Sequence, residues 1–154
     1  MEQHIMILDL ETILKEWEED CKIPQHQLDE TSRNTPSLHA KYLQYLSLTK
    51  LQLKREESKQ QKLLKLKWLY YNGKMDQQEL QKLGWSPDPF NGLKILKGEM
   101  DYYYNSDPEI QTSEERITYF KTLISTLTDI VDALKWRHQT IGNIIKWRQF
   151  EAGG

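Results

Sequence analysis

Apolar residues recur at helical spacing in three parts of this 154-residue chain. The first part has apolar positions three or four residues apart, which predicts a short helix that ends before Pro24. Residues 25–34, which follow it, are polar, and we interpret them as a linker. The apolar positions of the first helix are Ile7, Leu10, Leu14 and Trp17.

The second part predicts a long helix. Thr35 followed by Pro36 is typical of a helix start, and Asn72-Gly73 is typical of a helix end. Residues 54–62 are polar all round, so this middle stretch is expected to be exposed or to face a polar partner. Residues 62–71 also alternate apolar and polar, as a strand does. We favour a helix there, because no turn signal precedes the alternation.

Capping signals predict the elements that follow. Asp76 with Glu79 forms a capping-box pattern, and Gly84 is a stop signal, so one short helix is expected between them. Residues 93–104 have the composition of another short helix. Thr112 with Glu115 forms a second capping box, which predicts the start of a long C-terminal helix.

The third part is this C-terminal helix, and its apolar positions follow heptads. Two heptad rows and a flanking row make a stripe wider than a dimer seam, which favours a bundle or a ring of several copies. His138 falls in one of the rows, and Trp136 and Trp147 lie on a second face. The alternative is that both faces are packed within one monomer. The residues predicted to face other copies are Ile117, Phe120, Leu123, Ile124, Leu127, Ile130, Val131, Leu134, Ile141, Ile144 and Ile145.

These patterns predict a mainly α fold of long helices, with a C-terminal heptad helix that forms a ring-like homo-oligomer. We divide the chain into an acidic N-terminal helix and linker (1–34), a basic helix with short helices and loops (35–110), and an oligomerisation helix (111–154). The net charge of −2 hides a strong asymmetry between an acidic start and a basic middle. Such asymmetry indicates different partners for the two regions.

The composition argues against several classes of protein. The single cysteine, Cys21, fits a reducing compartment, and the start of the chain has no signal-peptide pattern, so we expect a cytoplasmic protein without a membrane span. The four histidines are scattered, which predicts no metal site. No phosphate-binding P-loop, nucleophile elbow or other catalytic pattern occurs, so we expect no cofactor and no enzymatic activity.

Basic residues with aromatic neighbours give the candidate binding site. On a helix, cations at three- and four-residue spacing lie along one side, where they can neutralise phosphates while aromatic rings stack on bases. The alternative is a solvated lysine face with the aromatic rings in the core. The predicted single-stranded DNA contacts are Arg55, Lys59, Lys62, Lys65, Lys67, Trp68, Tyr70 and Tyr71.

Four short motifs, in this order, make the chain similar to a known family. They are residues 65–73 (KLKWLYYNG), 84–87 (GWSP), 99–103 (EMDYY) and 148–153 (RQFEAG). Together they resemble the UvsY-like recombination mediators of T4-like bacteriophages. The match runs from the middle of the second helix to the end of the chain.

The resemblance implies a function. It suggests a protein that binds single-stranded DNA, forms a hexamer- or heptamer-sized ring through its C-terminal segment, and works in the cytoplasm of an infected bacterium. Its other implied partners are the phage recombinase, which it would load onto DNA, and the phage single-strand-binding protein that covers this DNA. Lys65 and Lys67 match the basic pair of the family, although the second position has arginine in the relative we compared. The competing hypothesis is a coiled-coil assembly adaptor that does not bind DNA.

Overall fold

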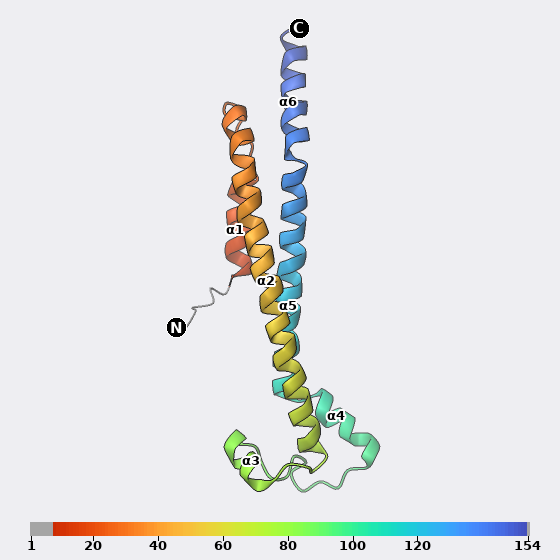
Figure 1. Cartoon of the computed structure of the whole chain (residues 1–154). Helices are drawn as coiled ribbons and strands as arrows, with labels where there is room; N and C mark the ends of the chain where they lie inside the picture. Colours follow the sequence, from red (N-terminus) through yellow and green to blue (C-terminus); the bar gives the residue numbers. More distant parts are fainter. Residues whose placement is uncertain (1–7, 154) are drawn as a thin grey trace, which may run out of the picture. The chain divides into compact units, whose positions relative to one another are not determined.

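The computed structural model describes residues 8–153, and this part of the chain is all-α without a strand (Figure 1). The mainly α fold expected from the sequence is therefore confirmed. Ile7, expected in the first helix, lies outside the described residues. In chain order the helices are α1 (Leu10–Asp20), α2 (Leu28–Tyr71), α3 (Gln77–Leu83), the 3-10 helix η1 (Lys97–Glu99), α4 (Met100–Asn105), α5 (Pro108–Lys135) and α6 (Arg137–Glu151).

The described chain forms two compact units. The first unit contains the residues up to Leu51 and those from Phe120 onward, and the second unit is Gln52–Tyr119. The first unit thus combines segments from both ends of the chain, and the second unit is the continuous stretch between them. The division into 1–34, 35–110 and 111–154 stays a prediction about roles.

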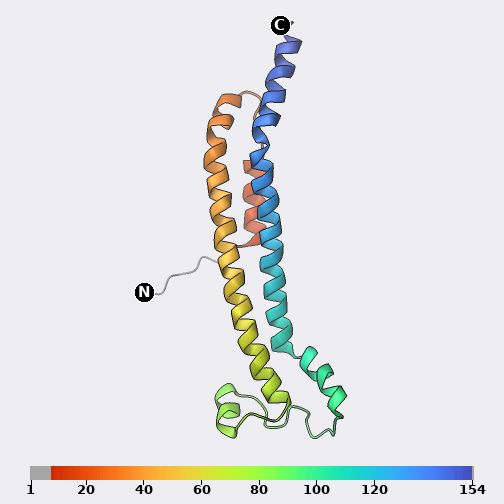
Figure 2. The same cartoon turned by 45° about the vertical axis from the view of Figure 1, so that its right-hand side comes forward.

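In the first unit, α1 lies antiparallel to the first part of α2, and the end of α5 and α6 complete the bundle (Figure 2). Ile13 and Tyr42 are buried here, and the Tyr42 ring meets Trp17 edge-on at 5.6 Å. Leu14, expected on the buried face of α1, is 47% exposed, so the sequence prediction was wrong by one position. Ile13 takes its place on the buried face.

Helix α2 begins earlier than the sequence suggested. It starts at Leu28, and Pro36 lies inside it. Proline has no amide hydrogen, so position 36 cannot donate to the Ser32 carbonyl, and one helical hydrogen bond is missing. Next to it, Thr35 donates its hydroxyl to the Thr31 carbonyl at 2.8 Å. Thr31 is buried, so the segment interpreted as a linker has a packed side. The predicted start at Thr35-Pro36 was therefore wrong.

The other end of α2 agrees with the prediction. Residues 62–71 are helical, which removes the strand alternative. Gly73 has a φ of +67°, and the Lys74 amide donates to the Leu69 carbonyl at 2.9 Å, as in a glycine-terminated helix. The Asp76 carboxylate likewise accepts from the Glu79 amide at 2.8 Å, so the predicted start of α3 is confirmed.

The C-terminal helix differs from the prediction at both its start and its middle. Asp107 caps α5 by accepting from the Glu109 and Ile110 amides, so the helix starts at Pro108 and Thr112 is inside it. Helix α5 ends at Lys135, and α6 begins at Arg137, so Trp136 interrupts the predicted single helix.

The buried positions keep their three- and four-residue spacing across the interruption at Trp136, and Arg137 falls in the row of Leu123 and Ile130. His138, predicted in a core row, is exposed, and Arg137 is buried instead. The Arg137 guanidinium donates to the carbonyls of Asp20 and Lys22, at 2.9 and 2.8 Å. It thereby satisfies unpaired acceptors at the C-terminal end of α1.

Most of the predicted oligomerisation residues are buried by their own chain. Only Ile145 is exposed, at 42%, while Ile124 and Ile144 are half-buried. Burial inside their own chain leaves most of these side chains little surface for another copy, and their role in assembly stays a prediction. The residues buried within the chain are Ile117, Phe120, Leu123, Leu127, Ile130, Val131, Leu134 and Ile141.

Candidate nucleic-acid interface

Four cations of α2 form what we call the basic face: Arg55, Lys59, Lys62 and Lys65. All four side chains are exposed and belong to the second unit. Lys59 lies 3.6 Å from the Glu56 carboxylate but keeps 70% of its side chain in solvent. Within residues 8–153, Arg55, Lys62 and Lys65 have no ion-pair partner. Their positive charge is therefore available to an external anion.

Trp68 adds an aromatic surface one turn beyond Lys65. Its side chain is 47% exposed, and the Lys74 ammonium lies 4.8 Å from the centre of its ring. An exposed ring with a cation over one face is suited to stacking on a nucleobase next to a phosphate contact. Lys74 was not among the residues chosen from the sequence.

Lys67 lies in a different environment from the basic face. Its side chain is 5% exposed, and its ammonium lies 3.0 Å from the Asp107 carboxylate and 3.3 Å from that of Glu109. The same ammonium lies 4.0 Å from the centre of the Trp85 ring. The Tyr71 hydroxyl donates to Asp107 at 2.6 Å. We call these five residues the Lys67 cluster.

The Lys67 cluster changes which residues can touch DNA. The Lys67 charge is already balanced by two carboxylates. Tyr70 is buried, and its hydroxyl donates to the Ser86 carbonyl at 2.7 Å. Tyr71 is half-buried and bonded to Asp107. Lys67, Tyr70 and Tyr71 pack within the second unit, so their contact with DNA stays a prediction that these partners argue against.

Electrostatics in the Lys67 cluster favour an ionised carboxylate. Burial acts to raise the pKa of Asp107, but hydrogen bonds from Tyr71, Lys67 and the Ile110 amide outweigh it, so this pKa lies below its usual value. Burial and the bond to Asp107 raise the pKa of the Tyr71 hydroxyl. Asp107 is thus kept ionised and Tyr71 is kept protonated, as the hydrogen bond between them requires.

The polar middle of α2 has a partner in α5. The Glu56 side chain is 6% exposed and accepts from the Arg116 guanidinium at 3.0 Å. Most of residues 54–62 are exposed, as one alternative predicted, and Glu56 alone faces a polar partner in α5. The partner residues missed from the sequence all lie far along the chain from the residues that they contact. Trp85, Asp107 and Glu109 come at least 18 positions after Lys67, and Arg116 comes 60 positions after Glu56. A local pattern could reveal only the Asp107-Pro108 pair, which is typical of a helix start.

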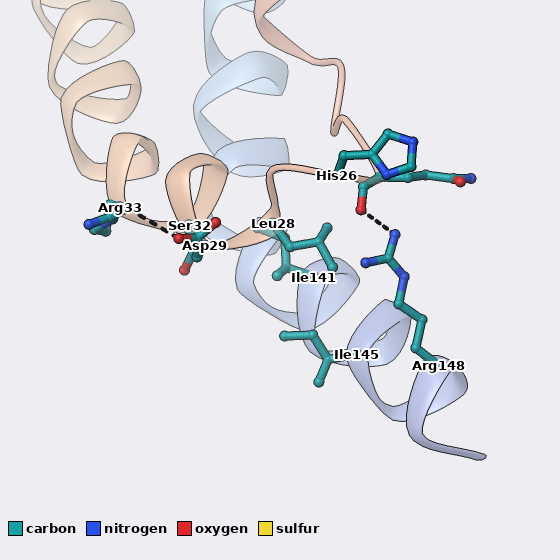
Figure 3. A pocket seen from close by; sticks show the side chains of 9 residues that line it. His26, Leu28, Asp29, Ser32, Arg33, Ile141, Ile145 and Arg148 are labelled. Carbon is teal, nitrogen blue, oxygen red and sulfur yellow. Dashed lines mark hydrogen bonds and ion pairs between the residues drawn. The ribbon is translucent and has the colours of Figure 1, made fainter. Parts of the chain in front are cut away.

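A groove lies in the first unit, between the α1–α2 loop and α6 (Figure 3). Its volume is about 910 Å³, and Leu28, Ile141 and Ile145 form its apolar part. The Arg148 guanidinium donates to the Gln25 carbonyl across one end. The groove leaves part of Ile145 open to solvent.

Comparison with known proteins identifies the family. The family described as "Recombination, repair and ssDNA binding protein UvsY" matches residues 16–154. The chain belongs to the UvsY family. It is 28% identical over 144 residues to "Recombination protein uvsY" of Enterobacteria phage T4, covering 94% of this chain and 98% of that protein.

Solved structures agree with this family assignment. The crystal structure of the bacteriophage T4 recombination mediator protein UvsY in lattice type II matches with a TM-score of 0.76 and 26% identity, over 94% of this chain and 98% of the other. The lattice type I structure matches with a TM-score of 0.74 and 25% identity, over 91% and 98%. The fold is therefore the UvsY fold.

Three of the four motifs that resemble the UvsY family meet in the second unit. The Tyr70 ring lies 5.0 Å from Trp85, Tyr71 lies 6.0 Å from Phe90, and Phe90 lies 5.0 Å from Tyr103. Three motifs that are separate in sequence thus build one aromatic cluster around the end of α2. Their common role in this chain is to fix the 72–107 segment against that helix.

Among residues 8–153, no three histidine, cysteine, aspartate or glutamate side chains gather so that they could hold a metal ion. None of the helices in this range is long and apolar enough to cross a membrane.

Proposed function

We propose that this protein binds single-stranded DNA through the basic face and promotes loading of the phage recombinase onto DNA covered by single-strand-binding protein. The observation that carries the proposal is the row of exposed cations, of which Arg55, Lys62 and Lys65 have no carboxylate partner in the described chain. Membership of a family of recombination, repair and ssDNA binding proteins supports it.

Within the proposed interface the residues have two roles. The four cations of the basic face neutralise phosphates and release counterions, which gives affinity without sequence preference. Trp68 stacks on a base, and Lys74 holds a neighbouring phosphate. The protein acts in this proposal by binding and not by catalysis, in the cytoplasm of the infected host cell.

We further propose that several copies form a ring through α6. Trp136 and Trp147 are each 62% exposed, and Phe150 is 71% exposed. Ile145, open in the groove of Figure 3, lies on a different side of α6 and offers a separate apolar contact. Large exposed apolar side chains close together are typical of protein–protein contacts. A ring would repeat the basic face and raise a modest affinity per subunit by multivalency.

A filament-assembly measurement tests the mediator role. The phage recombinase is added to single-stranded DNA covered by the phage single-strand-binding protein, and the lag before ATP hydrolysis by the recombinase is recorded. The wild type should shorten the lag, and Lys62→Ala/Lys65→Ala should shorten it much less. A lag that is the same with and without the wild-type protein would leave the adaptor hypothesis as the better account.

A further inference from the structure

A groove separates the last part of α2 from the first turns of α5, two segments that lie side by side in the second unit (Figure 2). Its volume is about 520 Å³, within the range of sites for small ligands. Leu63 and Pro108 form its apolar part, and Glu56, Lys59 and Arg116 add charged groups. Because Lys59 also belongs to the basic face, the groove adjoins the proposed DNA-binding surface. We call it the α2–α5 groove.

The Glu56 carboxylate uses only one of its two oxygens within the chain. Its Oε1 accepts from the Arg116 guanidinium at 3.0 Å and lies 3.6 Å from the Lys59 ammonium. Its Oε2 accepts no hydrogen bond from the described residues. No buried side-chain oxygen of residues 8–153 lacks a partner, so Oε2 has to reach the surface, although the side chain is only 6% exposed. The groove that Glu56 lines gives a hydrogen-bond donor access to this oxygen.

The charges around the α2–α5 groove balance one another. The lining has two carboxylates, Glu56 and Glu109, and two cations, Lys59 and Arg116. The Glu109 carboxylate also lies 3.3 Å from the Lys67 ammonium. A phosphate in the groove would meet as many negative as positive side chains, whereas a neutral group would meet no net repulsion. The groove therefore suits a neutral ligand that donates a hydrogen bond to Glu56.

A nucleobase of the strand held by the basic face has these properties. It is neutral and planar, and its faces can pack against the apolar part formed by Leu63 and Pro108. Cytosine, adenine and guanine each carry an exocyclic amine, and a glutamate carboxylate accepts hydrogen bonds from such an amine. Uracil and thymine have a carbonyl oxygen where cytosine has its amine, and a carboxylate repels that oxygen. The groove can therefore distinguish between bases, which the basic face cannot do.

We propose that the α2–α5 groove binds one base of the single-stranded DNA and prefers a base whose exocyclic amine donates to Oε2 of Glu56. This inference rests on the proposed function, because the basic face must hold the strand whose base enters the groove. Lys59 binds the phosphate next to that base. Arg116 is a positioning residue, since it holds Oε1 and leaves Oε2 for the base.

Titration of the full-length protein with labelled oligo(dC) and oligo(dU) tests this preference. The two oligonucleotides have the same length and charge and differ only at the C4 and N3 positions of the base. The wild type should bind oligo(dC) at least about fivefold more tightly at the same salt concentration. In Glu56→Gln, Arg116 would hold the amide oxygen and the amide NH2 would face the groove. The preference for oligo(dC) should therefore vanish or reverse in this variant.

A second variant fills the groove without changing the carboxylate. Ser113 lines the groove and is half-buried, so Ser113→Leu should exclude the base and remove the preference, while the dependence on salt stays that of the wild type. Gln111→Leu adds the same side chain at an exposed position of α5 outside the groove, and this matched control should keep the preference. If Glu56→Gln loses its helical circular dichroism, Ser113→Leu and its control decide the question.

Two outcomes would overturn the inference and leave the basic face intact. One is equal affinity of the wild type for oligo(dC) and oligo(dU), with both weakening steeply as salt rises. The other is a preference for oligo(dC) that survives in folded Glu56→Gln or in Ser113→Leu. A wild type that binds neither oligonucleotide at low salt would instead contradict the proposed function, and with it the premise of the base-binding groove.

Discussion

Lys65 and Lys67 are two positions apart in α2 and have opposite environments. The Lys65 side chain is exposed, whereas the Lys67 ammonium is enclosed by Asp107, Glu109 and the Trp85 ring. A helix turns by about 100° per residue, so a separation of two places side chains on nearly opposite faces. At the scale of single residues, one lysine is therefore free for DNA and the other holds the second unit together.

Replacing Lys67 by methionine tests this assignment. The change keeps the length of the side chain but leaves Asp107, which is 3% exposed, without its cation. Removing one partner of a buried ion pair costs about 3 kcal/mol of unfolding free energy. Urea denaturation should show this loss. The matched control, Lys65→Met, should change stability by less than about 0.5 kcal/mol, and equal stabilities of the two variants would contradict the burial of Lys67.

Asp107 predicts a pH dependence of stability. Its pKa is lower in the folded protein than in the unfolded chain, so it stabilises the fold above the unfolded value of about 4, and this contribution is lost as the pH falls through the folded value. Asp107→Asn lacks this titration. The difference in unfolding free energy between the wild type and this variant should be largest at neutral pH and shrink below about pH 4. A constant difference across this range would be inconsistent with the lowered pKa.

At the scale of elements, the local signals identified where helices end better than where they begin. Gly73 and Gly84 stop α2 and α3 as expected, because a positive φ at glycine is a local requirement. The start of α2 and the interruption at Trp136 were missed, because tertiary contacts decide them: Thr31 is buried, and Arg137 binds the end of α1. The exposed cations of the basic face could be predicted from their helical spacing. The Lys67 cluster could not, because it depends on contacts between residues about 40 positions apart.

Pro36 provides a test of where α2 begins. In the interior of a helix, Pro36→Ala restores a missing hydrogen bond and should raise the unfolding free energy by about 1 kcal/mol or more. If the helix started at Pro36, the same change would be neutral or destabilising, since proline is favoured at a first helical position. Thermal unfolding compared with Ser37→Ala, an exposed neighbour, distinguishes the two cases.

At the scale of the whole molecule, the burial of the heptad residues changes how assembly must be tested. Leu127 is fully buried, so Leu127→Asp would unfold the first unit and could not report on subunit contacts. The exposed aromatic residues of α6 are the better targets. The function proposed for the basic face depends on assembly only through multivalency, so the two proposals can be tested separately.

Light scattering on Trp147→Ser/Phe150→Ser tests the ring. Both side chains are exposed, so the variant should keep its helical circular dichroism while its mass in solution falls toward that of one chain. Leu14→Ser, which also removes an exposed apolar side chain but lies on α1, is the control and should assemble as the wild type does. A wild type with the mass of one chain would refute the ring.

The most direct test of the central claim is the salt dependence of single-stranded DNA binding. The wild type should bind tightly at low salt and weaken steeply as salt rises. Removing two phosphate contacts with Lys62→Ala/Lys65→Ala should lower affinity and reduce the slope of log K against log salt by about 1.4. A double variant of two exposed lysines elsewhere, Lys15→Ala/Lys82→Ala, should leave the slope unchanged. Absence of binding at low salt, or equal slopes for all three proteins, would contradict the assignment of the basic face as the DNA-binding surface.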